Sequence, residues 1–331
     1  MNLLYIGKYP PLEGGVGAAA FWRIKELRAR GYNIDILTAK NKSEIYVSEF
    51  NTDDQKYHLI QSKSCWHIPY SPLLLERMVS YGLKLVSNNK FDCIEGNYIF
   101  PFGIAAWMLS KITGIPFVLR HAGSDIWRVY NPELEDIFKQ IIKDTTRIIT
   151  YEESLPFWNA LNTPKGKLFI SKHYAPSKEF WNAGCLKQEK AVFFHKLTPK
   201  WNWAQLDFFG SKLKQQGYKG YVECYCVGES DEMFMNVKKV FGKYGLSAHF
   251  HEFVSPDRMP NILKDTKYIL VSNVPSNIPE MPNLLFEGLA SGCNVLLDSE
   301  NFNLDIINFK TKELSVNYEA YIKNQMEIYN F

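Results

Sequence analysis

Short apolar runs alternate with amphipathic stretches along most of the chain, and this rhythm predicts an α/β protein. The first apolar run, Leu3–Ile6, is followed by a loop that contains the four residues Gly14-Gly15-Val16-Gly17. A helical pattern then covers residues 18–30, and residues 33–37 form the next apolar run. Such a strand–loop–helix–strand unit is typical of doubly wound parallel sheets.

The same alternation continues through the rest of the chain. Further strands are predicted at residues 58–61, 93–95, 117–120, 147–150, 167–170, 191–194, 222–227, 248–251, 268–272 and 294–297. Helices are predicted at residues 73–87, 103–113, 203–216, 232–244, 259–265, 283–290 and, with no strand after it, 312–331.

Regular patterning fades around residues 171–190, and this break indicates a domain junction. We expect two Rossmann-like domains, residues 1–178 and 188–315, with residues 316–331 as a final helix. Ligands of open α/β sheets bind outside the carboxyl ends of the strands. The loops that follow the strands of both domains should therefore line a cleft between two facing parallel sheets.

Composition narrows the class of protein. The 331 residues are 46% hydrophobic and carry a net charge of +3, which is too weak a bias to indicate a nucleic-acid partner. The six cysteines are scattered, as in a cytoplasmic protein with reduced thiols. Residues 1–6 are too short for a signal peptide, and no apolar run reaches the ~20 residues of a membrane span. Peripheral contact with the inner face of a membrane stays open, as does the oligomeric state.

Three loops carry candidate chemistry. Glycines 14, 15 and 17, with Val16, precede a helix, where free amides attract anions, although a tight turn explains them equally well. His121 follows a strand and lies near Asp125, so it could contact a sugar or move a proton, or Asp125 could simply cap the next helix. Lys196 and Lys200 follow the first strand of the second domain, where a phosphate would need cations, but a solvated loop is an equal reading.

The stretch EMPNLLFEGLASGC, residues 280–293, is the most informative. Its helix begins near Asn283, and Glu287 lies four residues later on the same side. A carboxylate in an otherwise apolar helix needs hydrogen-bond donors, and ribose hydroxyls or backbone amides would supply them. The positive start of the helix could hold a diphosphate.

Several segments resemble one family in order along the chain. EMPNLLFEGLASGCNVLL resembles the donor-binding segment EGMPNVLLEAMACGxPVV of retaining family-4 (glycosyl transferases group 1) enzymes, which have the GT-B fold. GGVG resembles their first glycine loop, FVLRHAGSDI their HGSD segment, FISKHYAPSKEF their interdomain stretch and FFHKLTPKWNW their GRLxPxKG segment. The resemblance extends from residue 1 to about residue 298.

The resemblance implies a glycosyltransferase that moves a sugar, with retention, from a nucleotide sugar to an acceptor hydroxyl. The donor, UDP-linked or GDP-linked, would bind the second domain, and a saccharide or glycolipid acceptor the first, with neither metal nor further cofactor. Glu287 would hold the ribose, and His121 and Glu280 the transferred sugar. The remaining donor contacts would come from Lys196, Lys200, Asn283, Leu284, Leu285 and Gly228. Gly14, Gly15, Val16, Gly17 and Asp125 would line the acceptor side, and the last helix would return to the first domain.

This sequence departs from the family pattern at the proposed diphosphate clamp. Glu280 lies one residue closer to Glu287 than the first family glutamate does, Lys196 replaces an arginine, and Trp201 replaces a lysine. A lost charge-assisted hydrogen bond costs about 1.5–3 kcal/mol. These changes leave one alternative open, a non-catalytic GT-B binding or regulatory subunit. A second alternative is a glycosyltransferase that acts on modified DNA, because some of those enzymes share the GT-B fold.

Overall fold

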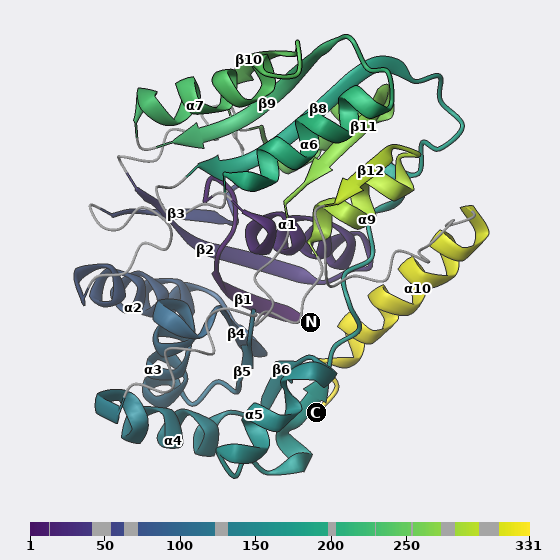
Figure 1. Cartoon of the computed structure of the whole chain (residues 1–331). Coiled ribbons are helices and arrows are strands. Elements are labelled where there is room, and N and C mark those ends of the chain that lie inside the picture. The colour runs from purple at the N-terminus through teal and green to yellow at the C-terminus, as the bar shows by residue number, and fades with distance from the viewer. Residues whose placement is uncertain are drawn as a thin grey trace.

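The computed structural model describes residues 1–12, 14–41, 54–62, 72–122, 132–197, 203–228, 230–252, 254–272, 282–297 and 311–331. They form two parallel sheets flanked by helices, so the predicted α/β architecture of two facing Rossmann-like sheets is confirmed. Figure 1 shows the two sheets one above the other, with α1 between them.

The first sheet has seven strands in the order β3-β2-β1-β4-β5-β6-β7, and every pair is parallel. Its strands are β1 (Asn2–Gly7), β2 (Asn33–Asn41), β3 (Tyr57–Ser62), β4 (Cys93–Asn97), β5 (Phe117–Arg120), β6 (Arg147–Thr150) and β7 (Leu168–Ile170). Its helices are α1 (Gly15–Ala29), α2 (Pro72–Asn88), α3 (Ile104–Thr113), α4 (Glu135–Asp144) and α5 (Leu155–Ala160). The strand order reverses between β1 and β4, a position where ligands bind in such sheets.

The second sheet has five parallel strands in the order β10-β9-β8-β11-β12. They are β8 (Gln188–Leu197), β9 (Tyr221–Gly228), β10 (Ser247–His251), β11 (Thr266–Val271) and β12 (Asn294–Leu297). The accompanying helices are α6 (Ala204–Gln215), α7 (Asp231–Gly242), α8 (Met259–Lys264) and α9 (Asn283–Ala290). Its order reverses between β8 and β11.

Apolar side chains cover both faces of each sheet, as expected of parallel strands. One of these cores also joins the two sheets. Trp22 on α1 is 4% exposed and contacts Phe180 edge-on at 5.3 Å, within a cluster that includes Leu285 of α9. Burial of this indole ties α1 to the second sheet.

The last helix, α10 (Thr311–Glu327), contacts α1, and its lower end and the C-terminus lie beside β6 (Figure 1). Arg147 of β6 donates to the carbonyl oxygens of Glu327 and Ile328, at 2.8 and 2.7 Å. Arg30, just after α1, forms an ion pair with Glu319 at 2.8 Å. Within the described part of the chain, no helix has both the length and the apolar character that crossing a membrane requires.

Candidate active site

The beginnings of α1 and α9 meet across the two domains. The side-chain amide of Asn283, the first residue of α9, donates to the carbonyl oxygen of Gly15, the first residue of α1, at 3.0 Å. Neither helix has an acidic residue in its first turn or a side-chain cap. Two positive helix ends therefore lie side by side, an arrangement that favours a multiply charged anion such as a diphosphate.

The glycines before α1 have different structural roles. Gly14 has a φ of +104°, which a residue with a side chain rarely adopts, and a Cβ on Gly17 would lie 2.8 Å from the Leu12 carbonyl oxygen. A Cβ on Gly15 would meet only the Asn283 amide nitrogen, at an ordinary 3.6 Å. Val16 packs against the core of the first sheet. The backbone thus requires glycine at 14 and 17, whereas the fold alone does not explain glycine at 15.

Glu287 lies one turn into α9 and is only 4% exposed. Its carboxyl accepts a hydrogen bond from the Tyr174 hydroxyl at 2.8 Å. Burial raises the pKa of Glu287 to about 7, and the bond from Tyr174 opposes this by lowering it. A buried carboxyl that changes charge near neutral pH can accept further hydroxyl donors, such as the 2′- and 3′-hydroxyls of a ribose.

Leu284 and Leu285 of α9, which were also expected to contact the donor, differ in how deeply they are buried. Leu284 is half-buried beside the core that joins the two domains. Leu285 is fully buried, and its amide donates to the Pro282 carbonyl oxygen at 2.9 Å. This amide is therefore engaged within the helix start, whereas the Asn283 side chain reaches the beginning of α1.

His121 lies deeper than the sequence suggested. It follows β5 but is only 1% exposed, and its Nε2 lies 3.0 Å from the Ser154 hydroxyl. Its ring also packs edge-on against Tyr151 and Trp158. In this structure the imidazole is thus enclosed by the first domain, so contact with a sugar would require this packing to change.

The structure describes only some of the residues that were expected to bind the diphosphate, the sugar and the acceptor. Lys196 and Gly228 lie at the carboxyl ends of β8 and β9, and the structure describes only the backbone of Lys196. Asp125, Lys200 and Glu280 lie outside the described residues.

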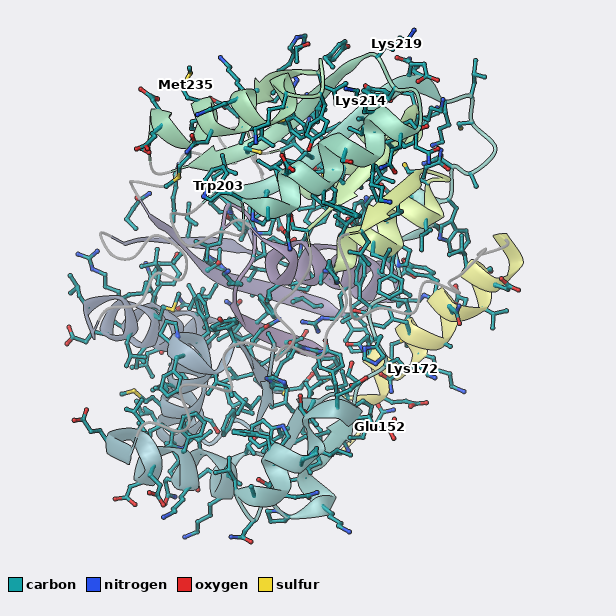
Figure 2. All side chains as sticks on the ribbon, in the orientation of Figure 1. Glu152, Lys172, Trp203, Lys214, Lys219 and Met235 are labelled. Carbon is teal, nitrogen blue, oxygen red and sulfur yellow. The ribbon has the colours of Figure 1, made fainter. Side chains whose placement is uncertain are left out.

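A pocket of about 560 Å³ lies between the carboxyl ends of β6 and β7, the segment after β7, and helices α9 and α10. Figure 2 shows two of its residues, Glu152 and Lys172, near the lower end of α10. It is lined by Glu152, Ile170, Ser171, Lys172, His173, Tyr174, Ala175, Pro176, Phe286, Leu314, Asn317, Ala320, Tyr321 and Asn324. Tyr174 belongs to this wall while its hydroxyl reaches Glu287, so the pocket adjoins the Glu287 carboxyl.

Sequence reasoning missed Tyr174 and the polar face of α10. Tyr174 lies 113 residues before Glu287, and no local pattern links the two.

Sequence reasoning also missed a buried ion-pair cluster that involves Arg23 of α1, although the sequence contains a signal for it. Glu95 is a lone acid inside the apolar strand β4, and it binds Arg23 and Arg120 at 2.6 and 3.0 Å. A buried charge of this kind requires a partner.

Comparisons with known proteins agree with this geometry. A family model described as glycosyl transferase 4-like matches residues 19–152. Comparison with curated protein sequences returned no match. The chain is similar along its whole length to solved structures of GT-B proteins, all at low sequence identity.

Three of these structures illustrate the likeness. An alpha-glucosyltransferase in complex with UDP-glucose and DNA containing an abasic site has 14% identity and a TM-score of 0.60, covering 100% of this chain and 94% of that one. A glycosyltransferase from Rickettsia africae has 13% identity and a TM-score of 0.60, with 99% and 93% covered. The Anabaena protein HepE, in complex with UDP and glucose, has 12% identity and a TM-score of 0.57, with 99% and 92% covered. The predicted fold is therefore confirmed: this chain has the two-domain GT-B fold, and its residues 19–152 match a family model described as glycosyl transferase 4-like.

Proposed function

We propose that this chain is a retaining glycosyltransferase that moves a sugar from a nucleotide sugar to a hydroxyl of a saccharide or glycolipid. The observation that carries the proposal is the meeting of the α1 and α9 starts at Gly15 and Asn283, with the Glu287 carboxyl one turn behind. Two similar structures were solved with UDP-glucose or with UDP and glucose, which favours a UDP-linked donor over a GDP-linked one.

In this proposal the donor diphosphate lies against the two helix starts, and the ribose hydroxyls donate to Glu287. Dipoles that are already aligned stabilise the negative charge that grows on the leaving diphosphate as the bond to the sugar breaks. Lys196 and Lys200 add positive charge there, without a metal ion, and Gly228 lines the donor side. Glu280 acts on the transferred sugar, and Asp125 acts on the acceptor side. His121 also contacts the sugar, which requires its packing against Tyr151 and Trp158 to open.

The first test is a thermal-shift panel of UDP, GDP, ADP, dTDP and CMP with their common sugars. A ligand at about 100 times its dissociation constant adds ~2.7 kcal/mol of stability, a shift of several degrees. We expect a UDP sugar to give this shift and Glu287→Ala to abolish it. A flat panel would instead support the non-catalytic binding subunit.

Gly15→Ala tests the diphosphate position. The backbone at Gly15 accepts a Cβ without strain, so the variant should unfold at the wild-type temperature while binding the donor at least tenfold more weakly, which is about 1.4 kcal/mol. Unchanged donor affinity in a folded Gly15→Ala protein would contradict a diphosphate at this helix start.

One observation favours a second candidate, a glucosyltransferase that acts on DNA. Its basis is the similar structure that contains UDP-glucose and DNA. The net charge of +3 provides little attraction for a polyanion, which is why we rank this candidate second. Transfer from a UDP sugar to duplex DNA carrying hydroxymethylated bases, with no transfer to saccharides, would reverse the order.

A further inference from the structure

The pocket between α10 and the segment after β7 has an inner wall that the donor site does not use. Residues Leu314, Asn317, Tyr321 and Asn324 recur at intervals of three or four along α10, so they share one face of the helix, and all four line the pocket. The adjoining face of α10, with Tyr318 and Ile322, packs into the protein in the same buried cluster as Tyr321, and the opposite face, with Val316, is exposed. The pocket wall is therefore a distinct, partly polar stripe of α10.

Two members of this stripe have unused polar groups. Among the described residues, neither the Asn317 amide nor the Tyr321 hydroxyl has a hydrogen-bond partner. The Tyr321 side chain is only 7% exposed, and its ring meets Tyr174 edge-on at 6.2 Å. An amide and a hydroxyl can each donate and accept, which matches the hydroxyl groups of a sugar.

Asn324 has a different role, because it builds the wall. Its side chain accepts from the Lys172 amide at 2.9 Å and donates to the Ile170 carbonyl at 3.2 Å. Next to it, Gln325 donates to the Ser171 hydroxyl at 3.0 Å. These bonds hold α10 against the end of β7, so the stripe keeps a fixed position relative to the first domain.

The charges of the pocket indicate a neutral ligand. Lys172 and Glu152 carry opposite charges, and His173 is paired with Glu153 at 2.9 Å. This wall offers no group of cations for a diphosphate, unlike the two helix starts. Its aromatic rings, Tyr174, Tyr321 and Phe286, provide flat apolar surfaces, and a mixed lining and a volume of about 560 Å³ suit a small polar ligand.

We propose that this pocket binds a neutral saccharide unit of the acceptor, and that Asn317 and Tyr321 of the C-terminal helix recognise its hydroxyl groups. This assignment rests on the glycosyltransferase function proposed above. It places the acceptor saccharide in the pocket lined by Tyr174, whose hydroxyl also donates to Glu287, the proposed ribose contact.

The test fills the pocket without removing any hydrogen bond. Ala320 lines the pocket, so Ala320→Trp should occupy it, whereas Val316 is 63% exposed and outside it, which makes Val316→Trp a matched control on the same helix. Binding of maltose, lactose, N-acetylglucosamine and methyl α-glucoside is measured by calorimetry and saturation-transfer NMR. Binding of UDP to each variant is measured in parallel.

We expect at least one sugar to bind the wild type and Val316→Trp equally, and Ala320→Trp about tenfold or more weakly. Tyr321→Phe, which keeps the ring and the fold, should weaken the same sugar several-fold while UDP binds all four proteins alike. Equal sugar binding by Ala320→Trp and Tyr321→Phe, or no sugar bound by the wild type, overturns the proposal. Loss of UDP from Ala320→Trp overturns it too, because the pocket would then hold the nucleotide. Failure of the donor proposal is seen separately, as wild-type protein that binds no UDP sugar.

Discussion

At the residue scale, the central feature is a buried acid that is neutral and charged in comparable amounts near pH 7. Burial raises the pKa of Glu287 to about 7, and the Tyr174 hydroxyl donates a hydrogen bond to this carboxyl. A ribose that donates two hydroxyls would favour the charged form, so donor binding should release protons at neutral pH.

The free energy of unfolding should vary with pH because of this carboxyl. In the unfolded chain its pKa is about 4.5, so the folded state holds the proton between about pH 4.5 and 7, and stability falls as pH rises through that window. Relative to Glu287→Gln, the wild type should lose about 3 kcal/mol between about pH 4 and pH 8. Urea unfolding of both proteins across this range measures the difference, and a constant difference would contradict a raised pKa.

The variant Tyr174→Phe tests how far the Tyr174 hydroxyl lowers the pKa of Glu287. It removes the hydrogen bond that lowers the pKa of Glu287, so the pKa should rise further. The loss of stability with rising pH, measured against Tyr174→Phe/Glu287→Gln, should therefore continue to a higher pH than in the wild type. The same urea series, run on Tyr174→Phe and on the double variant Tyr174→Phe/Glu287→Gln, tests this. An unchanged pH window would show that the hydroxyl has little effect on the carboxyl.

At the element scale, α1, β4 and the C-terminus are joined by one buried charged cluster. Glu95 of β4 binds Arg23 of α1 and Arg120 of β5, and it also accepts from the Tyr329 hydroxyl beyond α10. The two guanidiniums keep the pKa of Glu95 low, at about 2, against the opposing effect of burial. The cluster therefore fixes three elements and the chain end relative to one another.

Removing the acid from this cluster should be severe. Glu95→Gln leaves two buried guanidiniums without a counter-charge, which should cost about 3–5 kcal/mol. The exposed pair of Lys25 and Glu179 is the control, because Glu179→Gln should cost less than about 1 kcal/mol. Chemical unfolding at neutral pH compares the two, and equal losses would contradict a special role for burial.

At the scale of the whole molecule, Trp22 couples the two domains. Its side chain belongs to the first-domain helix α1 but is buried with Phe180 and Leu285. Trp22→Ala should cost about 3–5 kcal/mol and split one calorimetric unfolding transition into two. Trp158, which is buried only within the first domain, is the control: Trp158→Ala should destabilise the protein without separating the domains. A single transition in Trp22→Ala would show that other contacts maintain the coupling.

Much of the fold was predictable from the sequence. The apolar runs at residues 3–6, 93–95 and 117–120 became β1, β4 and β5, because strands buried on both faces need continuous apolar residues. The helix at residues 283–290 has the predicted bounds. The helices α4 and α5 were not predicted individually, although α4 is as long as the predicted α3.

The sequence by itself determined the succession of strands and helices along the chain, the glycine loop and the presence of an acid on α9. Each of these depends on neighbours within a few residues. Only the tertiary structure decided what those groups contact. It enclosed His121, paired Tyr174 with Glu287, and brought Tyr329 to Glu95 across 234 positions of chain. Such contacts follow from how two sheets and a returning helix pack, and local periodicity carries no information about that packing.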